Sequence, residues 1–198
     1  MPTFDDPDLE SALAKVVANK FTTPVVRHLE SCFKANFVGQ LRKLGGQATV
    51  IESRGTARAV PDVYCSAKGQ AFWIEMKFID VLAGSVSKLP FRAGQRQWLI
   101  ENMIGGGKSL VGAHFLDAYV FARGDVVAAT GGGIPFGHDK FRGYILQQKK
   151  LDVEAVLTWA EHAFTLPLLV TSVAKLPMRL SNPLRKERLK EQKEIVYR

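Results

Sequence analysis

The sequence predicts a mixed α/β domain, because helical and strand-like apolar patterns alternate along the chain. A long amphipathic helix is expected from Thr23 to about Leu44, where apolar side chains recur every three or four residues before Gly45-Gly46 ends the pattern. Three short strand patterns follow it, and then a helix, further strands and a last helix. This order is typical of a mixed central β-sheet flanked by helices.

The three strand patterns lie at residues 48–52, 62–67 and 71–79, where β-branched and aromatic residues are frequent. The short polar connection at 68–70 predicts that the second and third strands form a hairpin. Beyond them, a helix is expected over about 93–104, strands over 110–115 and 117–123, and a helix over 151–164, with residues 126–129 extending the sheet. A short helix is also expected near the start of the chain, over residues 9–19.

The length of 198 residues fits a single domain with some peripheral additions. We assign residues 1–174 to this domain, with a core at about 25–130, and residues 175–198 to a basic C-terminal tail. No segment approaches the roughly 18 consecutive apolar residues that span a bilayer, and the acidic N-terminus lacks the pattern of a signal peptide. A cytoplasmic protein that does not bind a membrane is therefore expected.

The chain is basic, with a formal net charge of +8 and a sequence pI near 9.6. An excess of this size indicates a polyanionic partner, usually nucleic acid, although a surface biased for solubility has the same composition. Much of the excess lies between Lys175 and Arg198, which contain eight Lys or Arg and three Glu. An RNA-binding module is disfavoured, because the Gly-aromatic signatures of the common RNA folds are missing.

The residues that indicate chemistry lie in the predicted hairpin. Asp62 follows Pro61 at the start of one strand, and Glu75 and Lys77 lie within the next. Strand side chains alternate between faces, so Glu75 and Lys77 are expected to point together toward a common surface while the apolar residues between them point into the core. Trp73 shares that face, where it either stacks on a base or packs in the core.

Two carboxylates and one ammonium group in this arrangement suit phosphodiester hydrolysis. Asp62 and Glu75 provide the hard oxygen ligands that Mg²⁺ prefers. A bound metal lowers the pKa of a water molecule, and Lys77 is placed to orient that water or to stabilise developing charge. The alternative interpretation is a solvated strand face with an incidental Glu–Lys pair.

The same residues resemble a known family. Pro61-Asp62 followed by Glu75-x-Lys77 is similar to the motif of the PD-(D/E)xK nuclease superfamily. Gln95-x-x-Trp98-Leu99 resembles a segment of the VRR-NUC branch and the Gln-bearing helix of RecU-type Holliday junction resolvases, and the similarity extends from about Glu30 to Arg123. It implies a restriction-endonuclease-like core.

The resemblance also implies roles for individual residues. Asp62 and Glu75 would hold Mg²⁺, with the Met76 carbonyl assisting, and Mn²⁺ would be able to substitute. Lys77 would be the catalytic lysine, Gln95 would face the active site and Glu30 would be an additional metal ligand. Basic residues around the motif and in the tail are expected to contact DNA, namely Arg54, Arg58, Lys88, Arg92, Arg96, Arg185, Lys186 and Arg188.

The function that these features predict is that of a Mg²⁺-dependent DNA endonuclease. The resemblance to resolvases points to branched DNA, with a Holliday junction as the leading substrate, and to a homodimer, because a resolvase cuts two symmetric strands. The alternatives are a VRR-NUC-type flap endonuclease or restriction-like endonuclease, and a non-catalytic DNA-binding protein. Intact Asp62, Glu75 and Lys77 argue against the last of these.

Truncation after Pro183 is expected to weaken DNA binding without removing cleavage of a saturating substrate. Each lost phosphate contact should reduce the slope of log affinity against log salt by about 0.9 on duplex DNA, which a salt titration of binding measures. The competing role for the tail is dimerisation. An unchanged slope together with a change from dimer to monomer in sedimentation would assign the tail to assembly instead.

Overall fold

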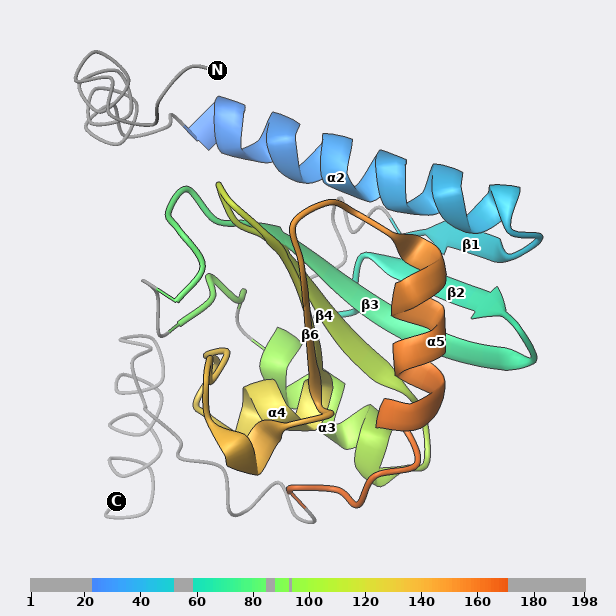
Figure 1. Ribbon diagram of the computed structural model, residues 1–198, viewed down its shortest axis with the longest axis vertical. Helices are drawn as coiled ribbons and strands as arrows, with labels where there is room; N and C mark the ends of the chain where they lie inside the picture. The colour runs from blue at the N-terminus through green and yellow to red at the C-terminus, as the bar shows by residue number, and fades with distance from the viewer. Residues whose placement is uncertain (1–22, 52–58, 85–87, 93, 171–198) are drawn as a thin grey trace, which may run out of the picture.

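The computed structural model describes residues 23–51, 59–84, 88–92 and 94–170. Its centre is a six-stranded sheet in the order β1-β2-β3-β4-β5-β6 (Figure 1). The strands are β1 (Gln47–Val50), β2 (Val63–Ala67), β3 (Gln70–Phe78), β4 (Ser109–His114), β5 (Tyr119–Arg123) and β6 (Ile145–Gln148). Strands β3 and β4 are parallel and the other neighbours are antiparallel, so the sheet is mixed as predicted.

Helices cover both faces of the sheet. On one face, apolar residues of α2 (Thr23–Lys43) and α5 (Val153–Ala163) form a core with Phe72, Ile74 and Met76 of β3. On the other face, α3 (Gln95–Ile104) and α4 (Gly124–Ala129) pack against strands β4 and β5. Figure 1 shows α2 passing along one end of the sheet and α5 lying across its front.

The β2–β3 hairpin is closed by a two-residue turn. Lys68 and Gly69 have φ angles of 48° and 71°, the positive values that a type I′ turn requires. The register that follows pairs Val63 with Ile74 and Tyr64 with Trp73. Because register decides which face each side chain takes, this turn fixes the face of Glu75 and Lys77.

The parallel pairing of β3 with β4 requires a crossover connection, and α3 supplies it. The chain leaves β3 at Phe78, crosses to the opposite end of the sheet through α3 and enters β4 at Ser109. As a result, the first turn of α3 lies over the second half of β3. This is the arrangement that brings Gln95 to the site described below.

A buried ion pair anchors the end of the described chain. The Arg123 guanidinium donates to both carboxylate oxygens of Asp125 and to the carbonyls of Ala163, Leu166 and Pro167. It also lies 4.7 Å from the Tyr144 ring centroid. A buried arginine with these partners is fully hydrogen-bonded, so it fixes the segment after α5 against α4.

The predicted elements differ from the structure in two places. Residues 126–129 do not extend the sheet but belong to α4, and Val126, Val127 and Ala128 are all buried. An apolar run this short has no periodicity that separates a buried helix from a strand. Strand β6 was not expected from the sequence, and with α5 it carries the hydrophobic core past residue 130.

The remaining predicted helices and strands of the described ranges are confirmed to within a few residues at their ends. The helix expected at residues 9–19 and the basic tail at 175–198 lie outside the described residues. No helix within the described ranges has the length and apolar character needed to cross a membrane.

Candidate active site

The candidate site lies in the second half of β3, on the face covered by α3. Glu75 and Lys77 point to this face, as their alternation with the core residues predicted. They are not on an open surface, however, because Glu75 is 0% exposed and Lys77 5%. The expectation of a common exposed surface is therefore wrong, and the reason is the crossover helix, which a strand pattern alone does not reveal.

Glu75 is held through one of its two carboxylate oxygens. Its Oε1 atom accepts a hydrogen bond from Gln95 Nε2 at 2.5 Å and lies 2.5 Å from Lys77 Nζ. The other oxygen, Oε2, is buried and has no hydrogen-bond partner among the described residues. Buried polar atoms are nearly always paired, so this oxygen is an exception to the usual pattern.

Gln95 is as buried as the carboxylate it contacts, at 1% exposure. Gly94, with a φ of 83°, turns the chain into α3 immediately before it. The Gln95 side-chain oxygen accepts a hydrogen bond of 2.8 Å from the backbone N–H of Arg92. That contact fixes the amide, so its NH₂ group must face Glu75.

Asp62 takes the place of a strand partner. Its Oδ2 atom accepts a hydrogen bond of 3.1 Å from the backbone N–H of Met76. Extending the β2–β3 register would set Pro61 opposite Met76, but proline has no N–H and cannot complete the ladder. The proline thus ends the pairing and leaves the Met76 carbonyl without that donor, while the neighbouring carboxylate satisfies the Met76 N–H.

Two cations approach the other oxygen of Asp62. Lys34 Nζ of α2 lies 3.4 Å from Oδ1, and Arg92 Nη2 lies 3.9 Å from it. The Arg92 side chain is 55% exposed, whereas the Asp62 side chain is 9% exposed. The Arg92 side chain therefore extends from solvent to the buried Asp62 carboxylate.

Sequence reasoning did not identify Lys34. The available signal was its position four residues after Glu30, which places the two side chains on the same face of a helix. Glu30 does lie at this end of the sheet, because the Phe78 backbone donates a hydrogen bond to it and Lys77, Asp62 and Lys34 all influence it electrostatically. Burial raises the pKa of Glu30, and the Asp62 charge raises it further.

The pKa of Glu75 is raised to about 7. Burial is the main cause, because it disfavours the charged carboxylate, and the Asp62 charge acts in the same direction. Lys77 and Arg92 offset part of this effect. Near neutral pH the protonated and ionised forms of Glu75 are therefore populated to a similar extent.

Three acidic and three basic side chains thus meet at this end of β3, namely Glu30, Asp62, Glu75, Lys34, Lys77 and Arg92. The described ranges contain no group of three or more His, Cys, Asp and Glu side chains that could hold a metal ion. The metal-ligand set of Glu30, Asp62 and Glu75 expected from the sequence stays a prediction.

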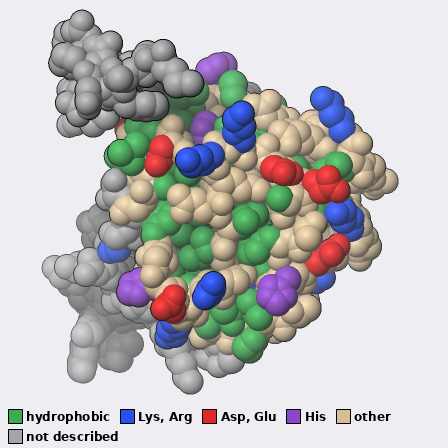
Figure 2. Space-filling view, viewed as in Figure 1, with side chains coloured by type: hydrophobic (Ala, Val, Ile, Leu, Met, Phe, Trp, Pro, Cys, Tyr) green, Lys and Arg blue, Asp and Glu red, His purple; other side chains and the backbone are tan. Residues whose placement is uncertain are grey.

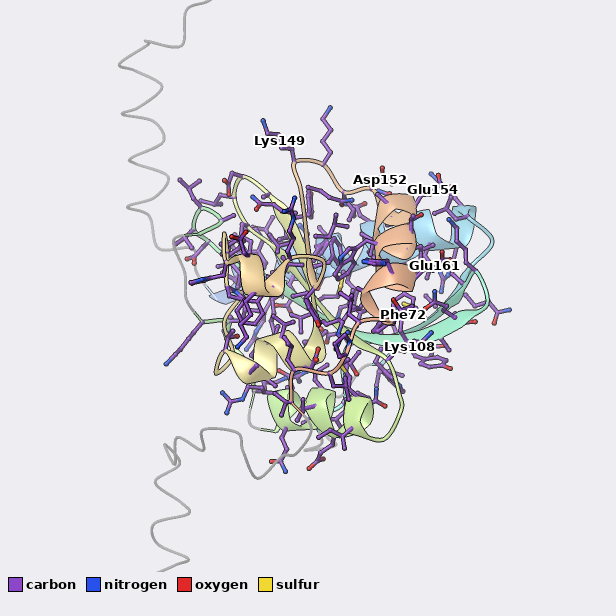
Figure 3. All side chains as sticks on the ribbon, turned by 60° about the horizontal axis from the view of Figure 1, so that its bottom comes forward. Phe72, Lys108, Lys149, Asp152, Glu154 and Glu161 are labelled. Carbon is purple, nitrogen blue, oxygen red and sulfur yellow. The ribbon has the colours of Figure 1, made fainter. Side chains whose placement is uncertain are left out.

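The predicted DNA-contacting residues are only partly described. Lys88 is exposed and Arg96 half-buried, on the segment that leads into and begins α3. The other five, apart from Arg92, lie outside the described residues: Arg54, Arg58, Arg185, Lys186 and Arg188. On the α5 side of the molecule, acidic and basic side chains are interspersed (Figure 2), and Asp152, Glu154 and Glu161 of that side are exposed (Figure 3).

No family model and no curated protein matches the sequence. Among solved structures, the chain is similar to Hjc from Archaeoglobus fulgidus, a Holliday junction resolvase from an archaeal hyperthermophile. The two share 19% identity over 48% of this chain and 78% of the other, with a TM-score of 0.39.

Glu75→Gln is expected to change how the stability of the metal-free chain depends on pH. The Glu75 pKa is raised in the folded state, so its contribution to stability is complete below about pH 4.5 and is lost as pH rises through about 7. The amide does not ionise and escapes this loss. In EDTA, the melting temperature of the variant relative to the wild type should rise between pH 5 and pH 8, by roughly 3 °C or more.

Glu161→Gln is the matched control, since Glu161 is an exposed carboxylate on α5 (Figure 3). It should show a constant difference from the wild type over the same range. A constant difference for Glu75→Gln as well would mean that Glu75 is already ionised throughout.

Proposed function

We propose that the chain is a nuclease that hydrolyses phosphodiester bonds in DNA with the help of a divalent metal ion, and that Asp62, Glu75 and Lys77 form its active centre. The observation that carries the proposal is the buried, unpartnered Oε2 of Glu75 beside a second carboxylate. A buried carboxylate oxygen without a partner is costly, even where the other oxygen is paired, and a ligand of positive charge would offset that cost.

The residues fit Mg²⁺, with Mn²⁺ as a substitute. In proteins, Mg²⁺ is commonly bound by one or two carboxylates, with waters and substrate phosphate oxygens as its other ligands. Glu75 and Asp62 supply that number, and the Met76 carbonyl, which Pro61 cannot pair, is a neutral oxygen next to both. Glu30 remains a candidate for a more distant role, either through a bound water or by balancing the charge of Lys77.

When bound, the metal would supply Lewis-acid activation of water and would neutralise charge on the phosphate. Lys77 would then act next to it. Its ammonium group already contacts Glu75 through one N–H direction, and an ammonium group has three donors. The remaining donors would be the groups that contact a water molecule or a phosphate oxygen, where a fixed positive charge stabilises the transition state.

Gln95 and the exposed cations have supporting roles. Gln95 holds Oε1 of Glu75, which leaves Oε2 as the oxygen for the metal. Arg92 is within reach of both the carboxylates and solvent, so it is suited to a phosphate next to the one that is cut. Lys34, at 3.4 Å from Asp62 Oδ1, would help to orient that carboxylate.

The preferred substrate is proposed to be branched DNA, and the active form a homodimer. Support for both comes from the resemblance of the Asp62, Glu75, Lys77 and Gln95 motifs to resolvases and VRR-NUC enzymes. A comparison of a synthetic four-way junction, a flap and a linear duplex, each with and without Mg²⁺, distinguishes the substrates. Sedimentation of the protein alone and on a junction tests the dimer.

Asp62→Asn and Glu75→Gln are each expected to abolish Mg²⁺-dependent cleavage of these DNAs, because each removes an anionic ligand. DNA binding should persist or strengthen, since negative charge facing phosphate is lost. Cleavage rates and binding are measured on the same substrates, with Glu161→Gln as the control. Wild-type cleavage rates in either variant would remove the metal-binding assignment.

Lys77→Met should lower the cleavage rate by roughly 10²-fold or more, as for other removed electrostatic groups. The pH profile separates two explanations. Lys77 lowers the Glu75 pKa, so a purely compensating lysine would make the defect disappear at high pH, where Glu75 ionises anyway. We expect the defect to persist from pH 7 to pH 9, and Lys149→Met, an exposed lysine (Figure 3), to behave as the wild type.

A further inference from the structure

Three aromatic side chains form a continuous row beside the candidate site. The Tyr64 and Trp73 ring centroids are 4.9 Å apart, and those of Trp73 and Trp98 are 5.2 Å apart. They come from β2, β3 and α3 respectively. Tyr64 is at the outer end of the row and is 37% exposed, and the two tryptophans are partly exposed. The row therefore runs from the helix–sheet interface out to solvent.

Each ring is two or three residues from a residue of the site, on the same face of the same strand or helix. Tyr64 is two residues after Asp62 and Trp73 two residues before Glu75, and side chains two apart in a strand share a face. Trp98 is three residues after Gln95, on the same side of α3. Two strand residues span about 7 Å, so the aromatic row is parallel to the polar row and adjacent to it.

Within the described ranges, the register neighbours of Tyr64 on this face are exposed and uncharged. Gln47 and Thr49 of β1, Ser66 of β2 and Ala71 of β3 share the face through the strand register, and all four are exposed. The cations described at the site gather instead at its other side, where Arg92 and Lys34 approach Asp62. The aromatic row and these two cations are therefore separate parts of the surface around the carboxylates.

We propose that this aromatic row is a binding site for an unpaired nucleobase of the DNA strand that is cut, with the Tyr64 ring as the stacking surface. The inference rests on the proposed function, because it takes the phosphate next to that base to be the one bound at Asp62 and Glu75. An aromatic side chain stacks on any base, since every base has a π-face.

The chemistry of stacking selects the substrate class. A base inside a duplex already has neighbours on both faces and offers none to a protein, whereas a base in a single strand, loop or end can be splayed onto an aromatic ring. The site therefore favours DNA with unpaired nucleotides next to the scissile phosphate. Ser66, Thr49 and Gln47 supply hydrogen-bonding groups to the base edge without adding charge.

The test measures binding in EDTA, where no cleavage occurs, with the full chain and three fluorescent probes. The probes are a short oligothymidine strand, a strand of the same length with abasic sites in place of the bases, and a duplex. The wild type should prefer the oligothymidine over the abasic strand by roughly tenfold or more. Tyr64→Leu should reduce that preference by about fivefold and leave duplex affinity unchanged.

Two further variants separate stacking from other effects of substitution. Tyr64→Phe keeps the ring and should keep the preference. Val50→Ala alters an apolar residue of β1 that is 41% exposed. Val50 pairs with Val63, which belongs to the core on the other face of the sheet from Tyr64. The Val50→Ala variant should therefore bind all three probes as the wild type does. The proposal is overturned if the wild type shows no preference, if Tyr64→Leu retains it, or if that variant weakens all probes equally.

These outcomes are independent of catalysis. A wild type that cleaves no DNA with Mg²⁺ would contradict the proposed hydrolysis while leaving a measured base preference intact. A preference that Tyr64→Leu does not change would contradict the nucleobase site alone.

Discussion

The burial of Glu75 is the constraint on which the surrounding structure depends. A carboxylate at 0% exposure with one unpaired oxygen costs free energy of folding, and its neighbours reduce that cost without removing it. Gln95 and Lys77 both contact Oε1, so neither satisfies Oε2. Asp62, a second negative charge, makes the ionised form less favourable still. An arrangement that stabilised the fold alone would place an apolar residue here, as Phe72, Ile74 and Met76 do on the other face of β3.

The backbone explains why these side chains meet. The type I′ turn at Lys68-Gly69 sets the register, Pro61 ends the pairing of β2 with β3, and the Asp62 carboxylate accepts the hydrogen bond of the Met76 N–H. The parallel pairing of β3 and β4 then brings the start of α3 over Glu75. Along this face of β3, the side chains change from the buried charged groups of Glu75 and Lys77 to the partly exposed ring of Trp73. The Trp73 ring in turn contacts the exposed Tyr64 ring of β2.

The features of this site that the sequence predicted are those set by neighbouring residues, and the features it did not predict depend on residues far apart in the chain. Alternation along β3 and the Lys-Gly connection are local, so the shared face of Glu75 and Lys77 and the hairpin were both predictable. The burial of that face was not, because it arises from α3, which packs through a crossover of long sequence separation. Lys34 was missed because its contact with Asp62 joins α2 to the sheet. Residues 126–129 were assigned to the sheet because Val126 and Val127 have high strand propensity, which packing overrides in α4.

Binding of Mn²⁺ to the protein without DNA tests the central claim, that the buried carboxylates are a cation site. Mn²⁺ bound to protein is distinguished from the free ion by electron paramagnetic resonance, and the titration needs no enzymatic activity. The wild type should bind the ion at one site more tightly as pH rises through about 7, where Glu75 ionises, and both Glu75→Gln and Asp62→Asn should lose that site while Glu161→Gln keeps it. Equal Mn²⁺ binding by the wild type and Glu75→Gln would contradict the account, because the unpaired Oε2 would then have no part in holding a metal.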